Sequence, residues 1–184
     1  TSDGICIFDG IKIKSIENKI SKNISMLYKV KPFFNTESLK IIYFSFIHSY
    51  LSYCNLAWAS TNYRKLKKIY CKQKHAFRII FGVNRTVNGE SLLKKLNVLN
   101  IYKLNIYQVM LFTFKTKHAL SPNIFRTYFT KISHKYPTKF SSDNFVIPRS
   151  YLKLNSFQIQ YRGPFIWKSF LKNMVNSFND FDKY

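Results

Sequence analysis

The segment from Ser60 to Gly82 holds the residues best suited to chemistry in this chain. It reads STNYRKLKKIYCKQKHAFRIIFG and contains no acid. On a helix, at about 100° per residue, its basic side chains all fall on one side: Arg64, Lys65, Lys67, Lys68, Lys72, Lys74 and Arg78. Like charges repel each other, and an ordinary solvated helix face mixes signs to gain ion pairs. We therefore expect this face to bind a polyanion, with a merely solvated face as the alternative.

The chain as a whole is also basic. Its 184 residues include 30 Lys and Arg against 8 Asp and Glu, which gives a formal charge of +22. Nucleic acid or an anionic membrane surface is the usual partner of such a protein. Codon bias in an A+T-rich gene is the competing explanation for the many lysines, but it would also raise Asp and Glu, which are scarce.

Catalytic and metal-binding chemistry is poorly represented. A nucleotidyl transferase needs clustered carboxylates, yet only Asp180 and Asp182 are close in sequence, near the chain's end. Cys71 and His75 have the spacing of two zinc ligands on a helix, but no second pair accompanies them. We interpret them as a surface thiol and histidine, and His48 as a core histidine. The sequence predicts no active site, metal or cofactor.

Cysteine usage and leader signals bear on the compartment. The three cysteines, Cys6, Cys54 and Cys71, share no motif spacing, which favours a reducing compartment over a disulfide framework. No basic-then-apolar leader is visible. We expect an intracellular protein of the nucleus or cytoplasm.

The uncharged window 41–59 is long enough to span a bilayer, but serines, His48 and Asn55 interrupt it, so a membrane span is the lesser alternative.

Helical periodicity dominates the elements that must position the basic face. Residues 16–31 carry one apolar stripe that Pro32 stops, and Asn35, Thr36 and Glu37 can cap a second helix. That second helix shows apolar residues at steps of three and four, namely Leu39, Ile42, Tyr43, Phe46, Ile47, Tyr50 and Leu51. It is expected to be central in a small bundle. Ser60, Thr61 and Asn62 can cap the basic helix, and Gly82 can end it.

The second half of the chain changes character along its length. After the turn-rich GVNRTVNGES, the sequence predicts a short helix ESLLKKL, a long helix over 101–120 and a short helix from Ser121-Pro122 through Phe129. Residues 131–144 are expected to form a loop. Alternation in SFQIQYR predicts short strands before Gly163-Pro164, and FIWKSFLKNMV predicts a last helix.

Several blocks, taken in order, carry a family resemblance. KISKNISMLYKV, the aromatic segment ending in SYLSYCNLAW, LKKIYCKQKHAFRII, FTFKTKHALSPNIF and YRGPFIWKSF resemble the region after the catalytic palm in LINE-type (non-LTR) retrotransposon reverse transcriptases. The shared positions are Lys19 to Lys22, Tyr50, Leu51, Tyr53, Cys54, Trp58, Leu66, Lys68, Ile69, Gln73, Lys74, Ala76, Arg78, Ile79 and Ile80. The family has asparagine after the tryptophan, where this chain has Lys168.

The resemblance implies a fragment of an RNA-directed DNA polymerase. It implies a mainly α fold, in which a polymerase-thumb-like helical bundle grips the template–primer and is followed by a small C-terminal α+β extension. The Y-x-D-D-type carboxylates and their magnesium would belong to a palm upstream, so the chain alone is expected to be inactive. Tyr43, Phe46, Tyr50, Cys54 and Trp58 would pack as scaffold. RNA, DNA or an RNA–DNA hybrid is the expected partner, rather than a small-molecule substrate.

These expectations divide the chain into four parts. Residues 1–15 are read as a diverged remnant of the palm-to-thumb approach, 16–82 as the thumb-like bundle, 83–130 as a helical connector and 131–184 as the C-terminal extension. Two alternatives stay open, a membrane-associated basic protein and a functionless retroelement remnant.

Overall fold

A computed structural model describes residues 2–60, 63–130, 145–149 and 157–181. The described residues are mostly helical, as expected from the sequence, and no strand occurs among them. They form two compact units, Thr1–Asn105 and Ile106–Tyr184, and the boundary falls within one helix.

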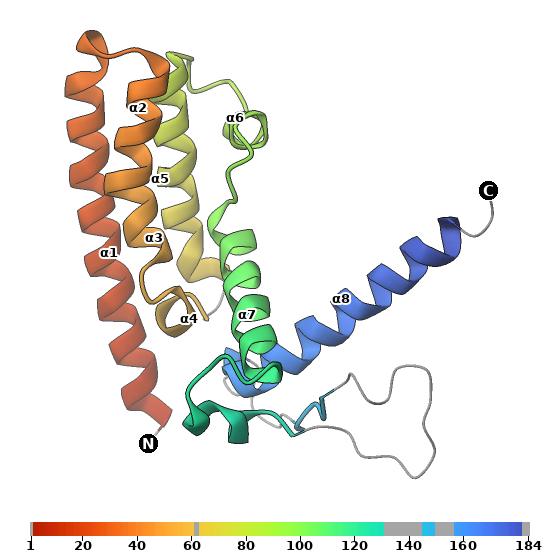
Figure 1. The fold of residues 1–184 in the computed structure, drawn as a ribbon. Coiled ribbons are helices and arrows are strands. Elements are labelled where there is room, and N and C mark those ends of the chain that lie inside the picture. The colour runs from red at the N-terminus through yellow and green to blue at the C-terminus, as the bar shows by residue number, and fades with distance from the viewer. Residues whose placement is uncertain (1, 61–62, 131–144, 150–156, 182–184) are drawn as a thin grey trace. The chain divides into compact units, whose positions relative to one another are not determined.

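The first unit is built on three long helical segments that run side by side (Figure 1). They are α1 (Ser2–Val30), the segment made of α2 (Thr36–Tyr43), η2 (Phe44–His48) and α3 (Ser49–Ser52), and α5 (Tyr63–Phe81). Short helices complete the unit: η1 (Lys31–Phe33), α4 (Asn55–Trp58) and α6 (Gly89–Lys95). The predicted boundary at residue 16 falls inside α1.

The predicted helix boundaries around Pro32 are confirmed. α1 ends at Val30, and Pro32 lies in the 3₁₀ turn η1 that follows. Asn35 caps α2, since its side chain accepts a hydrogen bond from Ser38 N at 2.9 Å, and Glu37 stands in the first turn. This cap satisfies a backbone donor that the helix itself cannot.

The central segment differs from the predicted continuous α-helix. Residues 44–48 form a π-helical turn, which winds more widely than an α-helix, and Asn23 of α1 donates to Phe46 O there. The buried positions consequently recur at steps of four, as Leu39, Tyr43, Ile47 and Leu51. The stripe expected from a regular helix therefore drifts out of phase after Tyr43.

This change of phase corrects the predicted scaffold. Tyr43 and Trp58 are buried as expected, whereas Phe46, Tyr50 and Cys54 are exposed. Phe46 retains 48% of its surface in contact with solvent. The prediction of a packing role for these three side chains was wrong, because it assumed a winding of 3.6 residues per turn across the π turn.

The window 41–59 does not form one straight apolar helix. The helix is interrupted after α3, where Cys54 adopts a left-handed conformation with φ +48°. Within the part of the chain that the structure describes, no helix is long and apolar enough to cross a membrane.

The second unit contains the larger part of α7 (Ile101–Lys117), η3 (Asn123–Tyr128) and α8 (Ile159–Phe181). Phe129, Phe145 and Trp167 form its buried cluster, with Phe112 and Ile159 packed against them. Gly163 is required there, since a Cβ at this position would lie 2.7 Å from a ring carbon of Phe129.

The predicted strands of the C-terminal region are only partly covered by the described residues. The alternation in SFQIQYR was wrong as a strand signal, because Ile159 to Arg162 belong to α8. A spacing of four residues is compatible with one face of a helix as well as with one face of a strand. The residues that face the aromatic cluster have this spacing, namely Ile159, Gly163 and Trp167. The predicted loop 131–144 and residues 150–156 lie outside the described part, whereas the predicted last helix is confirmed.

Candidate nucleic-acid interface

The apolar side of α5 is packed into the core of the first unit. Leu66, Ile69, Ala76, Phe77 and Ile80 are all buried there. Gly82 ends the helix with φ +64°, and the Gly82 N and Val83 N groups donate to Ile79 O and Arg78 O at 3.1 Å. This glycine-terminated Schellman motif confirms the predicted helix end. The N-terminal cap candidates Thr61 and Asn62 lie outside the described residues.

A buried glutamine fixes the rotation of α5. Gln73 is fully buried, and its amide nitrogen donates to Tyr43 Oη and to Leu99 O, both at 3.0 Å. Its amide oxygen accepts from Ile101 N at 3.0 Å. Burial raises the pKa of the Tyr43 phenol, and the Gln73 hydrogen bond opposes that rise. Because a buried polar group is costly to leave unpaired, these bonds hold the opposite, basic side of α5 outward.

α6 packs against α5 through a glycine. Gly89 is buried, and a Cβ there would lie 2.7 Å from Lys74 Cβ. Tyr70 donates to Glu90 Oε2 at 3.1 Å, and Lys74 Nζ lies 4.3 Å from the centroid of the Tyr70 ring. The predicted short helix is thus confirmed, with Asn88 as its cap rather than as part of a turn.

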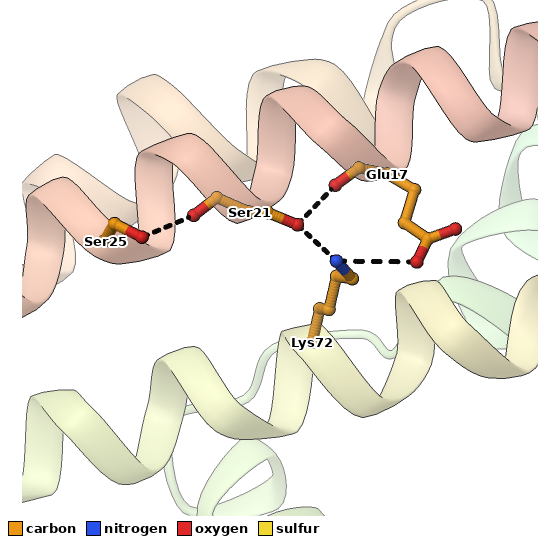
Figure 2. A network of polar contacts seen from close by, with 4 residues as sticks. All are labelled: Glu17, Ser21, Ser25 and Lys72. Carbon is orange, nitrogen blue, oxygen red and sulfur yellow. Dashed lines mark hydrogen bonds and ion pairs between the residues drawn. The ribbon is translucent and has the colours of Figure 1, made fainter.

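Lys72 is directed toward α1 (Figure 2). Its Nζ lies 3.4 Å from Glu17 Oε1 and donates to Ser21 Oγ. Ser21 in turn donates to Glu17 O at 2.8 Å. The side chains of Lys72 and Glu17 keep only 29% and 20% of their surface exposed. Of the predicted basic set, Lys72 therefore has an acidic neighbour and ties two helices together.

The C-terminal turn of α5 is also basic. Arg78 Nε donates to Val87 O at 2.9 Å, which ties the segment after Gly82 to the helix. Burial lowers the pKa of His75, and the charges of Arg85 and Arg78 lower it further. Protonation of His75 is thus disfavoured beside two guanidinium groups, an arrangement that a bound anion would relieve.

The remaining predicted residues lie on the outer surface of α5. Arg64, Lys65, Lys67 and Lys68 are exposed. Lys65, Lys67 and Lys68 form no ion pair with any residue that the structure describes. Of the seven predicted side chains, these four are exposed, whereas Lys72, Lys74 and Arg78 are half-buried and contact other elements. We call the surface of these seven side chains, together with Arg85, the basic face.

Three contributors to this surface were missed in the sequence. Gln73 interrupts an apolar stripe, and a polar residue in such a place signals a buried hydrogen-bonding site. Gly89 follows a cap-type asparagine, a position that does not itself require glycine. Glycine is required there because α6 packs closely on α5. Arg85 lies in a segment that returns past the end of α5, and no local pattern predicts that return.

The described residues contain no group of three His, Cys, Asp or Glu side chains placed to hold a metal ion. Comparison with protein-family models, with curated proteins and with solved structures returned no match.

Proposed function

We propose that this chain binds nucleic acid, in the form of RNA, DNA or an RNA–DNA hybrid, through the basic face. The observation that carries the proposal is the division of α5 into two sides. One side is fixed in the core by Gln73 and its apolar neighbours, and the other presents basic side chains without an intervening acid. Because the helix is fixed in this way, its exposed cations stay on the surface, and their mutual repulsion is relieved best by an external polyanion.

The mode of binding follows from the kinds of side chain present. Lysine and arginine on a helix contact phosphate oxygens, which give affinity without reading sequence. The residues proposed to make these contacts are Arg64, Lys65, Lys67, Lys68, Lys74 and Arg78, with Arg85 added. Lys72, which is engaged with Glu17, is assigned to the support of the face.

The finer identity is also a proposal. The resemblance described above favours a thumb and C-terminal region of a non-LTR retrotransposon reverse transcriptase, with the first unit as the thumb-like bundle. In that case catalysis, paired carboxylates and magnesium belong to a palm, and this chain supplies the grip on the template–primer. The small α+β extension expected after residue 131 belongs to the same proposal, as does a site of action in the nucleus or cytoplasm.

A salt series tests the binding proposal. The Kd of the purified chain for a hybrid duplex is measured at ionic strengths from 50 to 200 mM, roughly the range over which phosphate contacts are lost. We expect log Kd to rise linearly with log salt and to be the same for unrelated sequences. A Kd that stays constant over this range would contradict phosphate contact.

A further inference from the structure

A second feature of the first unit lies between α1, α3 and α4. It is a pocket of about 610 Å³, a volume within the range of about 300–1,000 Å³ that small-ligand sites occupy. Ile16 and Lys19 line it from α1, and Tyr50, Tyr53, Cys54 and Trp58 line it from the other side. Three of the lining residues are aromatic, namely Tyr50, Tyr53 and Trp58, and the others include Ser15, Ser49 and Ala57.

The break between α3 and α4 places Tyr53 at this pocket. Tyr53 has extended backbone angles and Cys54 is left-handed, so the helix ends and the Tyr53 side chain remains 76% exposed. The break is internally bonded, because Asn55 Nδ2 donates to Leu51 O and Trp58 Nε1 donates to Tyr53 O, both at 2.8 Å. An exposed aromatic ring thus stands on a well-fixed backbone.

The charge at the pocket is positive. Lys19 is the single charged side chain among the described lining residues, and its Nζ lies 5.3 Å from the centroid of the Tyr50 ring. Glu17, the nearest acid along α1, is directed to Lys72 on α5 instead. A ligand here would meet aromatic surface together with a cation and no opposing acid.

We propose that this pocket receives an unpaired nucleobase of the bound nucleic acid. The base would stack on Tyr53, and Lys19 would face the adjoining phosphate. A nucleotide uses both features of the site, since stacking of a base on an aromatic ring and attraction of its phosphate to a cation are independent contributions. An uncharged apolar ligand would use only the rings. This inference rests on the proposed nucleic-acid binding.

Duplexes that differ only at one end provide the first test. We expect a duplex with a single-stranded overhang to bind about tenfold more tightly than a blunt duplex, the effect of stacking one base. An overhang of abasic residues, which keeps the phosphates, should lose that advantage. Y53A should lose it too while keeping its affinity for the blunt duplex. Y53F should retain it.

Y28A serves as the matched control, since Tyr28 is similarly exposed, at 67%, and does not line the pocket. Y28A should keep the overhang advantage. An equal advantage for abasic and normal overhangs, or its survival in Y53A, would overturn the inference.

The alkylation of two native cysteines distinguishes failure of this inference from failure of the proposed function. Cys54 lines the pocket and Cys71 lies on the basic side of α5, and both are exposed. Alkylation by iodoacetamide is followed for each thiol by peptide mass spectrometry. We expect the blunt duplex to protect Cys71 alone and the overhang duplex to protect both.

Two other outcomes have a definite meaning. If Cys71 is protected by both duplexes and Cys54 by neither, the pocket does not take a base, whereas the proposed function stands. If neither thiol is protected and no duplex binds, the proposed function fails and the pocket assignment fails with it.

Discussion

The two halves of the basic face differ in how their cations are held. In the C-terminal half, Lys72, Lys74 and Arg78 each contact another element: α1, α6 and the segment before α6. In the N-terminal half, Lys65, Lys67 and Lys68 extend into solvent. The same helix therefore carries one set of cations that also supports the fold and another set that is exposed and forms no ion pair with the described residues.

The difference indicates a division of labour. A side chain that is already ordered loses little conformational entropy when an anion arrives, so the C-terminal half is preorganised. Exposed lysines lose more, but they keep their full charge for long-range attraction. We expect substitutions in the solvent-extended half to change binding alone. Substitutions in the anchored half should change stability, with a further effect on binding at Lys74 and Arg78.

The largest effect is expected from charge reversal in the solvent-extended half. K65E/K67E/K68E should weaken binding of a hybrid duplex by about 100-fold or more at low salt, and lower the slope of log Kd against log salt by about 3, one for each lost phosphate contact. Fluorescence anisotropy across a salt series measures both. The urea midpoint should stay nearly unchanged, because these side chains form no ion pair within the described structure.

A matched variant controls for net charge. Lys29, Lys94 and Lys103 are exposed lysines of the first unit that lie on α1, α6 and α7. K29E/K94E/K103E carries the same total charge as the triple variant on α5. If it weakens binding equally, the overall charge of the chain and not the face on α5 determines affinity.

The anchored half is tested first at its closest contact. G89A adds a Cβ at 2.7 Å from Lys74 Cβ, so α6 or Lys74 must shift. We expect a loss of about 1–3 kcal/mol in the free energy of unfolding, measured by urea denaturation. L99A, which truncates an exposed side chain in the same unit, should cost less. Unchanged stability in G89A would show that α6 is not packed against α5.

A double-mutant cycle examines the contact of Lys72 with α1. The pair with Glu17 is mostly buried and shares Ser21, so we expect K72M to cost about 1 kcal/mol in stability. E17Q/K72M should cost less than the two single changes together. Affinity for the hybrid duplex should fall less than twofold in K72M. A larger fall in affinity would indicate that Lys72 contacts phosphate.

The sequence predicted the parts of this fold that local rules control. The stop at Pro32, the cap at Asn35 and the end at Gly82 each depend on the chemistry of one or two residues. The apolar and basic sides of α5 follow from helical period alone. The π turn at 44–48 and the docking of α6 on Lys74 depend on partners distant in sequence, namely Asn23 and Gly89. For that reason the exposure of Phe46 and Tyr50 and the contribution of Arg85 could not be predicted.

The smallest effect concerns pH and distinguishes two histidines. The pKa of His75 lies below its ordinary value of 6.5, through burial and then through Arg85 and Arg78. The folded chain therefore binds fewer protons than the unfolded chain, and stability falls as pH decreases through about 6.5 toward the folded pKa. A polyanion across the basic face offsets the arginine charges and raises that pKa again. Affinity should therefore increase a few-fold as pH is lowered from 7.5 to about 5.5, an estimate from linkage.

His48 provides the comparison. Burial lowers its pKa as well, and its Nδ1 is buried without a hydrogen-bond partner in the described structure. It contacts the rings of Tyr43 and Phe44, and lies on η2 rather than on α5. H48N should therefore reduce the loss of stability at acid pH and leave the pH dependence of affinity unchanged. H75Q should abolish the pH dependence of affinity. NMR titration of both imidazoles with and without duplex measures the two pKa values. If binding raises neither, the anion does not lie beside His75, and the interface is confined to the solvent-extended half of α5.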